Sequence, residues 1–351
     1  MTEAEKNKII ADLEEQLTGD TLKDMQFLQK KADTYAGQDD GAEIAEAIVQ
    51  LAMSKMPQEN QDYLNKMLYL DGTRLSAVYQ EALKLSNQHL TAQSLKLTKQ
   101  LYDHIRENFK ETDTSRFFSF RNLLESNLYY QLYHPTKNLL KTPFDFTRYI
   151  TLHAYNLIEV RRTEEALPVL QEAIRLNPVN PDPRFELAEA YKLLGNRKML
   201  LETIKDTLPV CTSAYALARC YTNLGWYCTE LKDYDSAVAF YFESMIFEKH
   251  PAVPSELHHI SMLTEKPITP PTRQEVLKAF EKYKIRNGPG EEALHVVTSL
   301  SNQAIERKNW AEAVFYLYVI HDLTKDPAAK AMLERCQARL EEQVQQDKKE
   351  D

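Results

Sequence analysis

The chain has 351 residues, a formal net charge of −9, 43% hydrophobic residues and 27% charged residues. This composition can bury a core and excludes a disordered chain. Nucleic-acid binding relies on clustered Lys and Arg, whereas basic and acidic residues are interleaved here, so we expect no nucleic-acid partner. Only 8 glycines occur, roughly a third of average usage, which disfavours hairpins and phosphate loops and favours long helices.

No segment of the sequence has the character of a targeting or membrane element. Residues Met1–Lys6 are largely charged, and no run approaches the roughly 20 apolar residues that a membrane helix needs. We therefore expect a cytoplasmic protein without membrane insertion. The four cysteines, Cys211, Cys220, Cys228 and Cys336, form no Cys-x-x-Cys pair, so we expect buried reduced thiols and no metal site.

Helical periodicity dominates residues 1–146. Apolar residues recur at three- and four-residue steps on both sides of a predicted turn at Gly37–Gly41, which indicates a helical hairpin. A second hairpin is predicted over Thr73–Phe109, with a break near Ser86–Thr91. The segment Arg116–Tyr133 is rich in aromatic residues, which we interpret as the packed core of a further helix.

Start and stop signals become clearer after residue 147. Asp182 is a plausible N-cap with Pro183 at the first helical position, and Gly195 is placed for a left-handed C-cap. Within residues 252–293, Thr272 and Glu275 form the pattern of a capping box that begins a helix to about Ile285. These signals predict short antiparallel helices separated by tight turns.

Four 34-residue windows, beginning at Thr147, Pro181, Ala218 and Leu294, share a pattern of small residues. A small residue on a helix lets a second helix approach closely, because the interaxial distance depends on the contact side chains. The eighth place holds Ala154, Ala188, Gly225 and Ser301, and the twentieth holds Ala166, Leu200, Ala237 and Ala313.

This pattern resembles the tetratricopeptide repeat, most clearly in the third window with Tyr221, Leu224, Gly225, Asp233, Tyr234, Ala237 and Tyr241. The resemblance implies an all-α protein, a right-handed α-solenoid of antiparallel helix pairs. It divides the chain into N-terminal helical hairpins, degenerate or repeat-like (1–146), three repeats (147–251), a helical insert or degenerate pair (252–293), and a last repeat with a capping helix (294–351).

The family binds its partners on a concave surface lined by the first helix of each pair. The resemblance places six candidate residues there: Arg148, Tyr155, Phe185, Arg219, Asn223 and Trp226. The carboxylate clamp of chaperone-binding relatives is not reproduced, because Thr151, Tyr155 and Glu186 stand at three of its places.

Arg219, Asn223 and Trp226 fall at i, i+4 and i+7, on one face of a helix. Arg can hold a carboxylate, Asn can bond to a peptide backbone, and Trp supplies apolar area, so the set predicts a bound peptide. The alternative is that Trp226 packs against a neighbouring helix pair and that Arg219 is solvated.

The sequence contains no P-loop, dinucleotide-binding or nucleophile-elbow motif, so we expect neither an enzyme nor a cofactor. It predicts a scaffold or adaptor that binds a protein or peptide whose identity and stoichiometry the sequence does not give. Two alternatives remain open. One is a ligand- or peptide-responsive regulator built on the same repeats, and the other is an enzyme with a solenoid frame.

Overall fold

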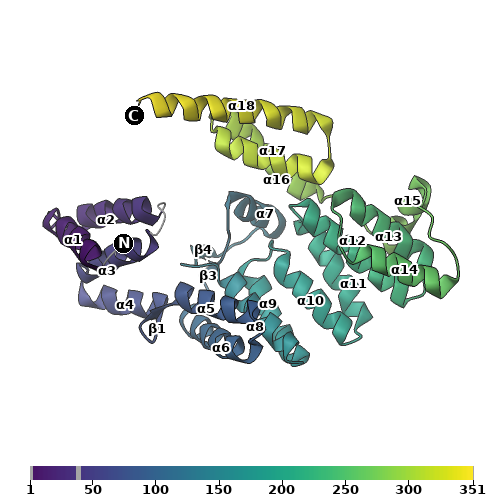
Figure 1. Ribbon diagram of the computed structural model, residues 1–351, viewed down its shortest axis with the longest axis horizontal. Coiled ribbons are helices and arrows are strands. Elements are labelled where there is room, and N and C mark those ends of the chain that lie inside the picture. The colour runs from purple at the N-terminus through teal and green to yellow at the C-terminus, as the bar shows by residue number, and fades with distance from the viewer. Residues whose placement is uncertain (1–2, 37–40, 351) are drawn as a thin grey trace. The chain divides into compact units, whose positions relative to one another are not determined.

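The computed structural model describes residues 3–36 and 41–350, and these residues are mainly helical (Figure 1). The chain forms two compact units, Met1–Val78 and Tyr79–Asp351. The predicted segment 1–146 therefore contains the first unit and the beginning of the second. Of the turn predicted at Gly37–Gly41, residues 37–40 lie outside the described residues.

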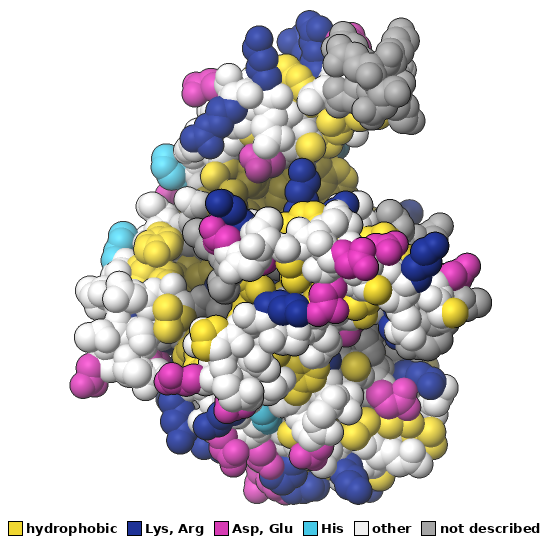
Figure 2. All heavy atoms as spheres, turned by 90° about the vertical axis from the view of Figure 1, so that its left-hand side faces the viewer, with side chains coloured by type: hydrophobic (Ala, Val, Ile, Leu, Met, Phe, Trp, Pro, Cys, Tyr) yellow, Lys and Arg dark blue, Asp and Glu magenta, His cyan; other side chains and the backbone are white. Residues whose placement is uncertain are grey.

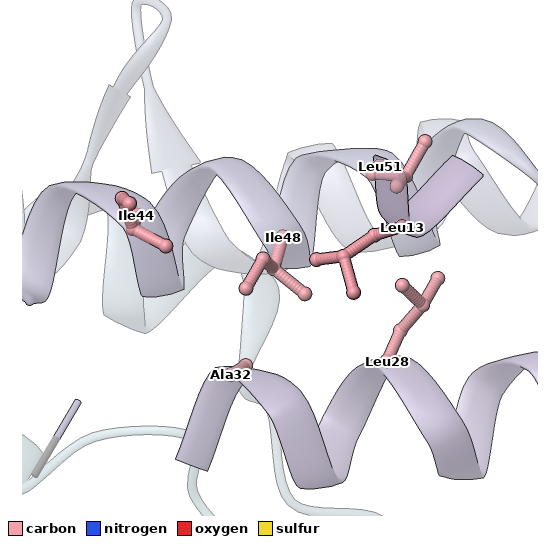
Figure 3. Packing of buried hydrophobic residues seen from close by; sticks show 6 residues of the cluster. All are labelled: Leu13, Leu28, Ala32, Ile44, Ile48 and Leu51. Carbon is pink, nitrogen blue, oxygen red and sulfur yellow. The ribbon is translucent and has the colours of Figure 1, made fainter. Parts of the chain in front are cut away.

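The first unit begins with α1 (Glu3–Glu15), α2 (Thr21–Ala36) and α3 (Ala42–Ser54), of which α2 and α3 form the predicted hairpin. Their apolar faces meet in one buried cluster, which Figure 3 shows from close by. The helix α4 (Gln58–Leu68) and a short antiparallel hairpin of β1 (Tyr69–Leu70) and β2 (Thr73–Arg74) follow. The residues of the cluster are Leu13, Leu28, Ala32, Ile44, Ile48 and Leu51.

The predicted second hairpin is confirmed as α5 (Leu75–Asn87) and α6 (Thr91–Asn108), and α8 (Phe146–Glu159) packs against α6. A buried polar network joins these three helices. The amide of Asn156 donates to the hydroxyl of Ser94 at 2.7 Å, and Ser86 donates to the amide oxygen of Asn156 at 3.1 Å. The ring of His153 lies 3.0 Å from the hydroxyl of Thr98. The network satisfies polar groups that would otherwise be costly to bury.

Burial lowers the pKa of His153 from 6.5 to about 4. Between these values the unfolded chain binds a proton that the folded chain does not, so stability falls as pH drops through this window. We expect His153 to account for about 2 kcal/mol of lost stability between pH 7 and pH 4.5. Urea unfolding at pH 7 and pH 4.5 should show a smaller loss of stability in His153→Gln than in the wild type. Equal losses in the two proteins would show that His153 is not the cause.

The aromatic segment Arg116–Tyr133 is not a single helix as predicted. Its first residues form β3 (Ser115–Phe118), which pairs in parallel with β4 (Asn138–Lys141), and only the later residues form α7 (Leu123–Tyr133). The core interpretation holds for Phe118 and Tyr129, which are buried, but the side chain of Tyr130 is 53% exposed. A strand pairing with a segment 23 residues away in sequence leaves no local periodicity to reveal it.

Three antiparallel helix pairs follow and occupy the region of the three predicted repeats. They are α8 with α9 (Thr163–Leu176), α10 (Asp182–Leu193) with α11 (Arg197–Thr207), and α12 (Ala214–Glu230) with α13 (Tyr234–Phe247). The small residues of the repeat pattern are buried in all of them. The two helices of the third pair approach closely at Gly225, where an added Cβ would lie 2.7 Å from the ring of Tyr241.

The turn signals are largely confirmed. Gly195 has φ +66°, as its predicted left-handed C-cap position requires, and Thr272 and Glu275 form the predicted capping box. Asp182, however, is the first residue of α10 and not its N-cap, which is Pro181. The difference arises because the side chain of Asn180 accepts the N–H of Asp182 and starts the helix one residue earlier.

A short 3₁₀ helix, η1 (Leu208–Val210), connects α11 to α12. After α13 the unit continues with α14 (Val253–Thr264) and α15 (Arg273–Tyr283), which both pack on α13. The last pair, α16 (Glu291–Glu306) and α17 (Trp310–Thr324), is followed by α18 (Pro327–Glu350), which packs on α17. Here α16 packs against α7 and η1, as Figure 1 also shows for α7. This pair therefore contacts α7, an early helix of the unit. Together the stacked pairs make an all-α solenoid.

All four cysteines are free and buried. Among the described residues, no helix is long and apolar enough to span a membrane. Figure 2 shows Lys and Arg side chains interspersed with Asp and Glu side chains over the face that it presents. The interleaving of charge seen in the sequence thus extends to this part of the surface.

Candidate functional site

A groove of about 470 Å³ opens between the first helices of two successive pairs, α8 and α10. Two of the six predicted residues, Arg148 and Tyr155, line it from α8, and both are exposed. They are seven residues apart, so they lie on one face of the helix two turns apart. The lining residues are Tyr79, Arg121, Asp145, Arg148, Thr151, Leu152, Tyr155, Asn180, Asp182 and Glu186.

The N-terminus of α8 fixes one end of the groove. The carboxylate of Asp145 caps the helix by accepting the N–H of Arg148 at 3.2 Å. The guanidinium of Arg148 lies 5.7 Å from the ring centre of Tyr79, which in turn stacks on the ring of Tyr149 at 4.3 Å. A cation over an aromatic face is attracted by the ring quadrupole, so Arg148 is held at the groove while it stays accessible.

Arg121 connects the loop before α7 to α10. Its Nε donates to Glu125 at 2.6 Å, and one of its terminal nitrogens lies 3.3 Å from the carboxylate of Asp182. The Glu125 carboxylate is buried and also accepts the amide of Asn177 at 2.8 Å and the Arg121 N–H at 2.7 Å. This network sets the position of the groove wall opposite α8.

Two carboxyl groups of the groove are partly removed from water. Burial raises the pKa of Asp145, and the N–H of Arg148 opposes that change. Burial also raises the pKa of Glu186, with Arg219 acting in the opposite direction. Removal from water strengthens the attraction of both carboxylates for a cation that enters the groove.

The residues predicted on the third pair lie against α10. The guanidinium of Arg219 is 4.6 Å from the ring centre of Phe185 and 3.4 Å from the carboxylate of Glu186. Phe185 is buried beneath it. Arg219 therefore reaches the edge of the groove through Glu186.

Asn223 and Trp226 share one partner on α10. The ammonium of Lys192 donates to the amide oxygen of Asn223 at 2.7 Å and lies 5.4 Å from the ring centre of Trp226. Asn223 is only 3% exposed, and its amide nitrogen has no hydrogen-bond partner among the described residues. Trp226 is half-buried. The face that the i, i+4, i+7 spacing predicts exists, and in this structure it packs on the neighbouring first helix.

Several groove residues were not among the sequence candidates. Tyr79 belongs to α5, Arg121 to the loop before α7, and Asn180 to the turn before α10. None lies on a first helix of a recognised repeat, so the 34-residue period could not point to them. Among these further groove residues, only Asp145 could have been found from the sequence, because an Asp before an apolar helix is typical of an N-cap.

Residues 218–243, which cover much of α12 and α13, match the family model of the tetratricopeptide repeat. The chain therefore contains a tetratricopeptide repeat at α12 and α13. A search among curated proteins found no match. The crystal structure of the APC/C hetero-tetramer Cut9–Hcn1 is similar, with 12% identity and a TM-score of 0.41 over 90% of this chain and 52% of that chain. The chain thus spans about half the length of that similar structure.

Tetratricopeptide repeats stack helix pairs into extended binding surfaces, so this protein is of the interaction-scaffold kind. Among the described residues, no group of three or more His, Cys, Asp or Glu side chains is arranged to hold a metal ion. The groove between α8 and α10 offers donors, acceptors and an exposed ring, which are the groups that a peptide can engage.

Proposed function

We propose that this protein is an adaptor that binds a peptide segment of another protein along α8, α10 and α12, in the groove that Arg148 and Tyr155 line. The observation that carries the proposal is the groove itself, with these two side chains exposed at its α8 wall. Arg and Tyr are the residue types that most often dominate the energy of protein interfaces.

The size and lining of the groove suit a few peptide side chains. About 470 Å³ lies within the range of ligand-binding clefts. The Thr151 hydroxyl, which donates to the carbonyl of Thr147, can still accept a hydrogen bond from a peptide N–H, and Leu152 and the Tyr155 ring offer apolar contact. The neighbouring pair adds support, since Arg219 and Lys192 connect α12 to α10 and hold the two helices in register.

The test uses peptides selected from a random phage-displayed library on the full-length protein. We expect the double variant Arg148→Glu, Tyr155→Ala to bind a selected peptide about thirtyfold more weakly, equivalent to about 2 kcal/mol. Fluorescence anisotropy of the labelled synthetic peptide measures this affinity.

The matched control carries the same substitutions away from the groove, Arg307→Glu and Tyr318→Ala, at two residues that are also exposed. It should bind the peptide as the wild type does. Circular dichroism melting must show both variants folded. If the groove variant and the control variant lose binding equally, or if both bind the peptide as the wild type does, the groove is not the binding site.

A further inference from the structure

The groove carries more negative than positive charge. Its lining holds the carboxylates of Asp145, Asp182 and Glu186 and the guanidiniums of Arg121 and Arg148. Arg121 is already bonded to Glu125, a buried carboxylate behind the wall. Glu159 is exposed one turn after Tyr155 on α8. A ligand in the groove therefore meets an excess of negative charge close by.

Not every carboxylate of the groove has a cation bonded to it. Asp182 lies 3.3 Å from Arg121, and Glu186 has a single contact with Arg219 at 3.4 Å. Among the described residues, Asp145 has no cationic group within 4.0 Å. Its carboxylate accepts a hydrogen bond from the backbone N–H of Arg148. Asp145 thus has the most unused capacity for charged hydrogen bonds, and Glu186 keeps some beside its single contact.

An aromatic ring completes the arrangement. Tyr155 is 39% exposed and lines the same groove, whereas the ring of Tyr79 is already covered by Arg148. An accessible ring beside carboxylates is a favourable place for an ammonium or guanidinium group. The carboxylates alone would be only an acidic surface. With the groove and the free ring, they give a site of defined chemistry.

We infer that the groove between α8 and α10 selects peptides with Lys or Arg side chains, whose cationic groups contact the carboxylate of Glu186 beside the Tyr155 ring or that of Asp145 at the N-terminal end of α8. This inference rests on the proposed function, because it names the peptide chemistry of the same groove. Arg148 then pairs with an acidic group or a backbone carbonyl elsewhere on the peptide. The preference is the reverse of that of a basic carboxylate clamp.

The experiment compares neutral isosteres that keep the local structure. Asp145→Asn preserves the helix cap, since Asn caps as well as Asp does, and Glu186→Gln preserves the shape of the side chain. The double variant Asp145→Asn, Glu186→Gln should bind a selected basic peptide about tenfold more weakly at low salt, and the difference should shrink as salt is added. Glu202→Gln, an exposed neutralisation on α11, should change nothing.

A peptide in which the basic residue is replaced with norleucine completes a double-mutant cycle. We expect the wild type to lose affinity for it about tenfold, while the neutralised variant binds both peptides alike. If the selected peptides are not enriched in Lys and Arg, or the neutralised variant binds them as the wild type does, the charge preference is wrong. If binding still depends on Arg148 and Tyr155, that result leaves the proposed function intact. If binding does not depend on these two residues, the proposed function is wrong as well.

Discussion

Replacing Gly225 with leucine is expected to lower the free energy of unfolding of the second unit by about 3 kcal/mol or more. The first added carbon would lie 2.7–2.8 Å from three atoms of the Tyr241 ring. That ring is fully buried, and its hydroxyl donates to Glu256 at 3.2 Å, so it has little room to move. The helices α12 and α13 would have to separate at this contact.

Urea unfolding followed by tryptophan fluorescence measures this loss. Both tryptophans, Trp226 and Trp310, belong to the second unit, so the signal reports on it alone. The control is Gly195→Leu, where φ is +66° and an added Cβ meets nothing within 4 Å. That variant should lose only about 1–2 kcal/mol from the left-handed backbone. A smaller loss at Gly225 than at Gly195 would contradict the close packing.

Replacing Glu125 with alanine is expected to cost about 3 kcal/mol, because three donors lose a buried acceptor at once. These donors are the N–H and Nε of Arg121 and the amide of Asn177. Arg121 is 41% exposed, and water can take over part of its solvation, which keeps the loss below that of a fully buried ion pair.

The same urea experiment tests this expectation. Glu125→Gln retains one acceptor oxygen and should lose about half as much. Glu107→Ala, an exposed glutamate on α6, should stay within about 0.5 kcal/mol of the wild type. Equal stability of Glu125→Ala and Glu107→Ala would show that the buried network does not hold the wall of the groove.

The repeat pattern in the sequence predicted most of the fold. Small residues such as Gly225 and Ala237 predicted close helix contacts, and both are buried where the contacts occur. Local rules were reliable wherever the cause was local, as in the capping box of Thr272 and the left-handed Gly195. These features depend on a few neighbouring residues, which a single sequence displays directly.

The errors came from interactions between distant segments. We predicted a helix at Phe117 and Phe118, but both residues belong to β3. Their strand partners in β4 lie more than 20 residues away, where local periodicity cannot reveal them. His153 stands at a place that is leucine in the other windows, and only the structure shows the Thr98 hydroxyl that makes its burial possible. The 34-residue period could not predict this polar network, because its partners Ser86, Ser94 and Thr98 lie outside the four windows.

The candidate site was predicted in part. The pattern placed Arg148 and Tyr155 on a first helix, where they line the groove. It could not tell that Asn223 and Trp226 would meet Lys192 of the preceding pair, because inter-repeat contacts depend on how pairs stack. The roles of all six candidates in binding stay predictions.

Photo-crosslinking tests the central proposal most directly. The photoreactive residue p-benzoylphenylalanine replaces Tyr155 in one protein and Tyr318, a more exposed tyrosine on α17, in another. Each protein is irradiated with a selected, labelled peptide and analysed by mass spectrometry. Binding in the groove predicts a crosslink from position 155 and none from position 318. A crosslink from position 318 alone, with the peptide still bound, would place the binding surface elsewhere.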